Sequence, residues 1–159
     1  MTARDEGARG WPDLAGRLTG EGHVLAVRVY YEDTDFTGVV YHAAYLKFIE
    51  RGRSDFLRLC GIHHARLADG AHGEALAFAV RHMEIDFHAP ARIDDLLEVT
   101  TRLDTARGAR LVLVQEVRRG DDVLFSARVT VAVISAQGRP RRLPADLAAR
   151  LAPGGREGA

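Results

Sequence analysis

The apolar and polar positions of the chain change from a two-residue period to a helical period and back again. Residues 23–32 (HVLAVRVYYE) alternate and are rich in β-branched and aromatic side chains, which predicts a strand. From about His42 the apolar residues recur at helical spacing, and Gly61 is suited to end the helix. This pattern predicts one long helix of about five turns. Its apolar stripe consists of Tyr45, Phe48, Ile49, Gly52, Phe56 and Leu59.

The rest of the chain is dominated by strand patterns. A short helical turn is expected over residues 62–69. Four strands are then predicted, over residues 76–88, 96–104, 109–118 and 122–135. The short connections ARG and RGDD predict antiparallel neighbours, and a brief helix over residues 144–151 closes the pattern. One long helix with about five antiparallel strands is a two-layer α+β architecture. The order strand, helix, four strands is that of a hot-dog fold, in which the sheet wraps around the helix.

Three segments are expected along the chain: a flexible N-terminal extension (residues 1–22), one folded domain (residues 23–152) and a disordered tail (residues 153–159). Both ends carry glycines and charges without periodicity. A chain of 159 residues with 47% apolar residues is long enough to bury the core of a single domain. Lys plus Arg and Asp plus Glu both number 22, and the resulting zero net charge argues against a nucleic-acid-binding protein.

The cellular compartment follows from three features of the sequence. Cys60 is the only cysteine, so no intramolecular disulfide can form and a reducing compartment is indicated. The first 22 residues lack the apolar region of a signal peptide. No stretch approaches the roughly 20 apolar residues that span a bilayer. We therefore expect a cytoplasmic protein without a membrane span.

Residues 30–42 concentrate reactive side chains at the junction between the first strand and the long helix. They include three acids, two threonines, three tyrosines and a histidine. A helix N-terminus offers unpaired backbone N–H groups and a partial positive charge, which polarise a carbonyl and stabilise an oxyanion. A carboxylate just upstream can act as nucleophile or as general base for water. These parts suit a hydrolase of thioesters, whose thiolate leaves readily.

The sequence of this region also resembles a known family. The run VRVYYEDTDFTGVVYHAAYLKFIERGRSDFL is similar to the opening signature of the 4-hydroxybenzoyl-CoA thioesterase-like hot-dog superfamily, and is most similar to the acyl-CoA thioesterases associated with the Tol-Pal system. The resemblance continues in FAVRHMEIDFHAPARIDDLLEV, in RGARLVLVQEV and in RPRRLP, so it covers about residues 24–150. It implies hydrolysis of short-chain aliphatic or small aromatic acyl-CoA without metal or redox cofactor. It also implies homodimers or homotetramers with sites at subunit interfaces.

The resemblance assigns the catalytic roles to three residues. Asp35 is the catalytic carboxylate, acting as nucleophile or base, and His42 and Tyr31 flank the thioester. The sequence departs from the family pattern at Phe36 and Thr37, where small residues such as Ala and Gly are common. Bulk beside the carboxylate would narrow the acyl pocket.

The resemblance also implies binding residues. Tyr41, Gly38 and Val40 are expected to bind the substrate, with backbone N–H groups around Tyr41 and His42 polarising the carbonyl. Arg107 and Arg110 are the expected contacts of the coenzyme A phosphates. Acyl carrier protein is an alternative carrier of the acyl group.

Two other functions stay open. One is a hot-dog dehydratase of 3-hydroxyacyl thioesters, which needs a histidine and an acid facing each other and does not fit the Y-E-D-T-D-x-x-G loop well. The other is a non-catalytic module that binds an acyl carrier or an envelope complex. Release of free thiol separates hydrolysis from both.

Several of these residues also have a purely structural explanation. Asp35 suits the cap of a turn or helix. The loop from Asp33 matches part of a calcium-binding EF-hand loop, but Ala44 replaces the required glutamate and a strand precedes it. Glu50 is a second possible base, but an ion pair with Arg51, Arg53 or a partner chain is the favoured interpretation. Cys60 fits a buried, inert thiol.

The third predicted strand offers one more cluster. His82, Glu84, Asp86 and His88 alternate on one face, which we interpret as the polar face of a half-buried sheet rather than as a metal site.

Overall fold

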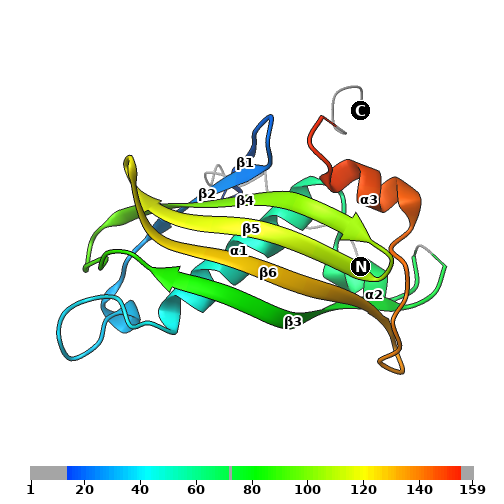
Figure 1. Ribbon diagram of the computed structural model, residues 1–159, viewed down its shortest axis with the longest axis horizontal. Coiled ribbons are helices and arrows are strands. Elements are labelled where there is room, and N and C mark those ends of the chain that lie inside the picture. Colours follow the sequence, from blue (N-terminus) through cyan, green and yellow to red (C-terminus); the bar gives the residue numbers. More distant parts are fainter. Residues whose placement is uncertain (1–13, 72, 155–159) are drawn as a thin grey trace, which may run out of the picture.

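One antiparallel sheet wraps around a single long helix in this protein (Figure 1). The computed structural model describes residues 14–71 and 73–154. The described strands are β1 (Arg17–Leu18), β2 (His23–Arg28), β3 (Leu76–Phe87), β4 (Leu96–Arg107), β5 (Arg110–Arg119) and β6 (Asp122–Ser135). They lie in the order β1-β2-β4-β5-β6-β3, so β3 forms one edge of the sheet. The predicted α+β hot-dog fold is confirmed.

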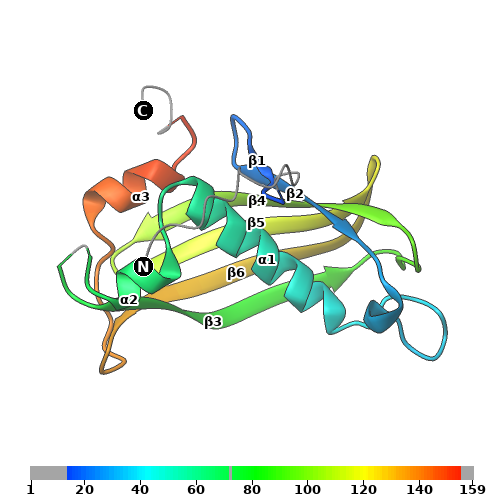
Figure 2. The same cartoon turned by 180° about the vertical axis from the view of Figure 1, so that it is seen from behind.

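Helix α1 (Ala44–Leu59) lies across the inner face of the sheet (Figure 2). It begins two residues after the expected start at His42. Its end is the predicted one: Gly61 has a φ of 80°, and the Ile62 N–H donates to the Leu57 carbonyl at 2.8 Å. This is a Schellman motif, which glycine favours because it adopts positive φ without strain. Two short helices complete the fold, α2 (His64–Ala68) and α3 (Ala145–Leu151).

The helix and the sheet approach each other most closely at Gly52. A Cβ there would lie 2.8 Å from Cγ1 of Val99 on β4. Next to it, the fully buried Gln115 of β5 donates from Nε2 to the Ile49 carbonyl at 2.9 Å and to the Thr101 hydroxyl at 2.8 Å. Because every polar atom buried here must find a partner, the bond to the Ile49 carbonyl fixes how α1 sits on the sheet, while the bond to Thr101 joins β5 to β4.

Part of the segment expected to be a flexible extension is a strand. β1 pairs with β2, and the Gly16 N–H donates to Asp55 Oδ2 on α1 at 2.7 Å. The same carboxylate oxygen lies 2.6 Å from Nε2 of the buried His23. A Cβ at Gly16 would overlap the Val24 carbonyl oxygen, so glycine serves close packing here. The expected extension and tail otherwise fall on residues 1–13 and 155–159, which lie outside the described residues.

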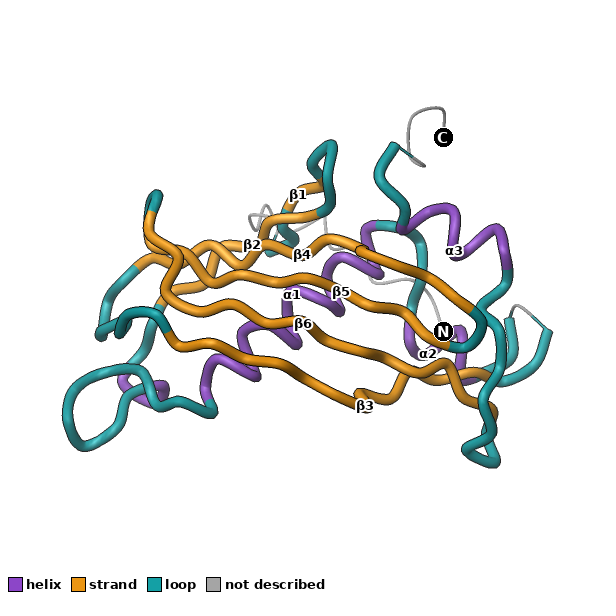
Figure 3. Tube along the Cα trace, in the orientation of Figure 1, coloured by secondary structure: helices purple, strands orange, loops and turns teal. Residues whose placement is uncertain are grey.

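The connections gather at the two ends of the sheet (Figure 3). One end carries residues 29–43, which include a short 3-10 helix (Tyr31–Asp33), together with residues 88–95 and the β5–β6 turn. The opposite end carries the β4–β5 turn, α2 and the connection to α3. The two ends are separated by the full length of the strands, which decides which residues can share one site.

The close approach at Gly52 leads to a test of the packing. Alanine at this position improves helix propensity by about 1 kcal/mol but places a methyl group against Val99. Because such overpacking typically costs about 1–3 kcal/mol, we expect Gly52→Ala to lower the free energy of unfolding. Urea unfolding at one fixed protein concentration measures this, with the exposed Arg51→Ala as a helix control. An unchanged or higher stability of Gly52→Ala would contradict the packing described.

Candidate active site

The Asp35 loop (residues 30–43) contains a tight hairpin between the end of β2 and α1. Thr34 and Val40 form an antiparallel bridge, and the Asp35 N–H donates to the Val39 carbonyl at 2.8 Å. The Gly38 N–H donates back to the Asp35 carbonyl at 3.0 Å, which closes a β-turn that starts at Asp35. Gly38 has a φ of 83°, a conformation that glycine adopts without a steric penalty. Asp35 therefore stands at the first position of an ordered turn.

The Asp35 carboxylate is held through one oxygen. Its Oδ1 accepts the Thr37 N–H at 2.8 Å and the Thr37 hydroxyl at 2.6 Å. Oδ2 has no hydrogen-bond partner in the described part of the chain. The Thr37 hydroxyl is the main cause that lowers the pKa of Asp35, followed by the Thr37 N–H, with smaller contributions from Val39 and His42. Asp35 thus caps its turn, as the structural interpretation of this residue expected. It still presents a charged, unpaired oxygen.

Three of the expected binding residues use their backbone N–H groups to build the loop. The Tyr41 N–H donates to the Asp33 carbonyl, and the Val40 N–H to the Ala91 carbonyl, both at 2.8 Å. The Gly38 N–H closes the turn on Asp35. Of the N–H groups around Tyr41 and His42 that were expected to polarise the carbonyl, the one of Tyr41 is thus already paired.

The free donors lie one residue further along. Among residues 14–71 and 73–154, no acceptor is found for the backbone N–H groups of His42 and Ala43, which immediately precede α1. The first turn of the helix adds the positive end of its dipole at the same place. These two N–H groups can receive a carbonyl oxygen.

Two aromatic side chains of the loop are open to solvent. Tyr31 is 83% exposed and Phe36 is fully exposed. The His42 imidazole packs on the Tyr41 ring with centroids 4.4 Å apart, and it lies near enough to Asp35 to lower its pKa. Tyr31 shares the loop, and its carbonyl accepts the Thr34 hydroxyl at 2.7 Å. One chain thus brings Asp35 and His42 together, but it does not enclose the space beside them.

Arg107 and Arg110 lie at the opposite end of the sheet from Asp35. They face each other across the β4–β5 turn, whereas the start of β4 follows residues 88–95, which contact the Asp35 loop. β4 has 12 residues, so this distance is on the order of 40 Å. These arginines therefore cannot reach Asp35 of the same chain, and their expected contact with coenzyme A, at a site shared between subunits, stays a prediction. Arg92, which forms a bridge with Val39, is exposed and much nearer.

Sequence reasoning missed two contributors to the site. Thr37 could have been recognised, because a threonine two residues after an aspartate is typical of an Asx turn. The 88–95 segment carries no local signal, since its link to the loop is the long-range bond from the Val40 N–H to the Ala91 carbonyl.

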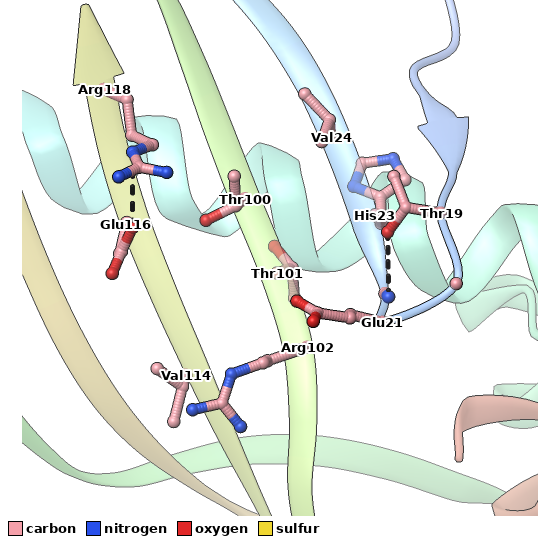
Figure 4. Close-up of a pocket in the computed structure, with 12 residues that line it drawn as sticks. Thr19, Glu21, His23, Val24, Thr100, Thr101, Arg102, Val114, Glu116 and Arg118 are labelled. Atoms are coloured by element: carbon pink, nitrogen blue, oxygen red, sulfur yellow. Dashed lines mark hydrogen bonds and ion pairs between the residues drawn. The ribbon is translucent and has the colours of Figure 1, made fainter. Parts of the chain in front are cut away.

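Two hollows of the described surface lie away from Asp35. One of about 540 Å³ opens on the outer face of the sheet below the β1–β2 turn and is lined by charged and hydroxyl-bearing side chains (Figure 4). A second, of about 150 Å³, lies between α1 and the sheet and has Glu50 at its rim. Glu50 accepts a hydrogen bond from Ser54 at 2.6 Å, and Ser54 lies 3.3 Å from Nε2 of His64. Among the described residues no ion pair joins Glu50 to Arg51 or Arg53, and a pair with a partner chain stays a prediction.

The strand cluster that suggested a metal is an exposed face of β3. His82 Nε2 lies 3.5 Å from Glu84 Oε1, and both side chains are largely exposed. Within the described ranges, no group of three or more acidic, histidine or cysteine side chains is arranged to hold a metal ion.

None of the described helices is both long and apolar enough to cross a bilayer. Cys60 is buried, as expected.

Comparison with known proteins identifies the family. The thioesterase superfamily model matches residues 37–126. The chain is 42% identical over 127 residues to the acyl-CoA thioester hydrolase YbgC of Escherichia coli. The aligned region covers 79% of this chain and 92% of that protein. The chain belongs to the thioesterase superfamily. The family and enzyme class expected from the sequence are thereby confirmed.

Other relatives agree with this assignment. An acyl-CoA thioesterase YbgC of Haemophilus influenzae is 40% identical, covering 74% of this chain and 84% of that protein. A crystal structure of a probable thioesterase from Bartonella henselae superposes with a TM-score of 0.75 and 52% identity, covering 77% of this chain and 99% of that one. The hot-dog thioesterase fold therefore extends over most of the described chain.

The hydrogen bonds to Asp35 predict how its titration responds to mutation. Thr37→Val keeps the backbone N–H but removes the hydroxyl, which is the main cause of the lowered pKa. We therefore expect the pKa of Asp35 to rise, so that the carboxylate is lost at a higher pH than in the wild type. A carboxyl-carbon NMR titration measures this, with Thr37→Ser as the variant that retains the hydroxyl. A pKa of Asp35 that is unchanged in Thr37→Val would contradict this view of the turn.

Proposed function

We propose that this chain hydrolyses acyl-CoA thioesters at the Asp35 loop. The observation that carries the proposal is the juxtaposition of a charged carboxylate, with Oδ2 unpaired, and the free N–H groups of His42 and Ala43 at the start of α1. A thioester needs a group that attacks or activates water and a donor pair for the developing oxyanion. The names of the YbgC relatives, acyl-CoA thioester hydrolases, support the same substrate class.

The mechanism follows from this arrangement. The thioester oxygen accepts hydrogen bonds from the His42 and Ala43 N–H groups, and the positive end of α1 stabilises the negative charge formed on it. Asp35 Oδ2 either attacks the carbonyl carbon, giving an anhydride that water then cleaves, or takes a proton from water as the water attacks. In both routes the carbon–sulfur bond breaks, the thiolate leaves and takes up a proton, and the free acid is released. His42, next to the carboxylate, assists the departing thiolate.

The acyl group is proposed to be short-chain aliphatic or small aromatic. Phe36 follows Asp35 directly and is fully exposed, so it is placed to limit the space beside the thioester. Coenzyme A is the proposed carrier, with acyl carrier protein as the second possibility, and no metal or redox cofactor takes part in the steps above. The cytoplasm, where acyl-CoA is available, is the proposed location.

We propose that the working form is a homodimer or homotetramer. The exposure of Tyr31 and Phe36 means that one chain alone does not enclose a substrate. β3 is an edge strand, and it exposes about half of the surfaces of Val80 and Phe87. An edge strand with exposed apolar side chains invites pairing with another chain. We therefore propose that a second copy of the chain encloses the substrate on the open side of the site.

Thiol release from a panel of acyl-CoAs tests the proposed activity. We expect the wild type to hydrolyse short or small aromatic acyl groups, and Asp35→Asn to lose roughly 10²–10⁴-fold in kcat, the usual contribution of such a group. Glu32→Gln, which neutralises an exposed carboxylate on the same loop, is the matched control and should retain activity. Equal rates for Asp35→Asn and wild type would remove Asp35 from the mechanism. The absence of thiol release from every substrate would favour dehydration or binding without catalysis.

The assembly is tested by light scattering of the purified protein. We expect a mass two or four times that of the 17.4 kDa chain. Val80→Asp, which places a charge on the exposed edge, should shift the mass towards a single chain and lower activity with it. Glu84→Gln, on the polar face of the same strand, should change neither. A fully active wild type with the mass of one chain would contradict the proposed assembly.

A further inference from the structure

Tyr45, in the first turn of α1, is held rigidly by its surroundings. Only 3% of its surface is exposed. Its ring stacks on Phe125 with centroids 5.0 Å apart and an interplanar angle of 3°, and it meets the edge of Phe87 at 5.8 Å. Aromatic contacts of this kind fix a ring beyond what simple burial does. The position of the Tyr45 hydroxyl is therefore fixed by the helix and the sheet together.

The hydroxyl is bonded to a buried backbone group of the 88–95 segment. The Ala91 N–H donates to Tyr45 Oη at 3.1 Å, and Ala91 is completely buried. The carbonyl of Ala91 accepts the Val40 N–H at 2.8 Å. Ala91 thus connects the helix side chain to the Asp35 loop through its own N–H and C=O groups.

Two further bonds carry the connection to the carboxylate. Val39, next to Val40, accepts the Asp35 N–H at 2.8 Å and also forms a bridge with Arg92. The order of contacts is therefore Tyr45 hydroxyl, Ala91, Val40 with Val39, and Asp35. All of these bonds except the first join backbone groups.

The 88–95 segment has several other anchors, among them the His88 and Ala89 N–H groups, which donate to the Leu124 carbonyl at 2.8 and 3.2 Å. Arg119 binds Asp95 Oδ2 at 2.8 Å and reaches the Pro90 carbonyl at 3.3 Å. These side chains are partly exposed, and ion pairs of this type contribute little. The buried bond to Tyr45 is the one that holds the Ala91 N–H.

We infer that Tyr45 is a positioning residue for Asp35, acting through Ala91 and Val40 without touching the substrate. This inference rests on the proposed function, since it concerns the placement of the catalytic carboxylate. Small displacements of a catalytic group lower the rate of the chemical step strongly. Binding of the acyl-CoA is not expected to depend on Tyr45.

The Tyr45 hydroxyl acts as a neutral group. Burial raises its pKa, and this outweighs the opposing effects of the Ala91 N–H and of Arg119, while Asp95 raises the pKa slightly further. Because the hydroxyl remains protonated in the range where a thioesterase is assayed, its removal should lower the rate to the same extent at each pH.

Tyr45→Phe is the variant that tests the inference, because it removes only the hydroxyl and keeps the ring. We expect kcat to fall about tenfold with KM within about twofold of the wild type. Thr101→Val is the matched control: it removes a buried hydroxyl that accepts Gln115 Nε2 at 2.8 Å below the middle of α1. We expect this control to lose stability without a comparable loss in kcat.

Amide hydrogen exchange gives a second readout that does not depend on activity. Residues 34–41 should exchange faster in Tyr45→Phe than in wild type, and Thr101→Val should leave them unchanged. In the wild type itself, the Ala91 amide should be protected. If Tyr45→Phe and Thr101→Val match in kcat and in exchange, or if the wild-type Ala91 amide is unprotected, the inference is overturned. A wild type that releases no thiol refutes the proposed function instead. The exchange data then still show whether Tyr45 holds the Asp35 loop through Ala91.

Discussion

The close approach of α1 to the sheet at Gly52 is the constraint on which the rest of the structure depends. Because this residue carries no side chain, the helix lies directly against Val99, and Gln115 fixes it there through the Ile49 carbonyl. The position of the helix then determines two features at its N-terminal end. It places the free N–H groups of His42 and Ala43, and it places Tyr45 against Phe125.

The candidate site combines two kinds of stabilisation. The charge of Asp35 is set locally, since Thr37 supplies both hydrogen bonds to Oδ1 within the same turn. The location of that turn is set from a distance, through the bond between Val40 and Ala91. A local cap keeps the carboxylate ionised and leaves one oxygen for chemistry, while the long-range contact holds it beside the helix.

Much of the fold could be predicted because its signals are local. Each of these signals depends on a few neighbouring residues: the alternation of the strands, the apolar stripe of α1 and the glycine at the end of α1. Other features depend on partners far along the chain. The glycines near Gly16 look like those of a flexible tail, yet Gly16 packs on β2. The occupied N–H of Tyr41 and the distant position of Arg107 follow from loop hydrogen bonding and strand length, which periodicity does not show.

A crystal structure with an unreactive acyl-CoA analogue, in which a methylene group replaces the thioester sulfur, tests the central claim most directly. The account predicts that the ketone oxygen lies about 2.7–3.1 Å from the backbone nitrogen of His42 or Ala43. It also predicts that Asp35 Oδ2, or a water bound to it, lies about 3–3.5 Å from the carbonyl carbon. An acyl group seated in the cavity beside Glu50, with its carbonyl carbon away from every Asp35 loop in the assembly, would contradict the assignment of the chemistry to this loop.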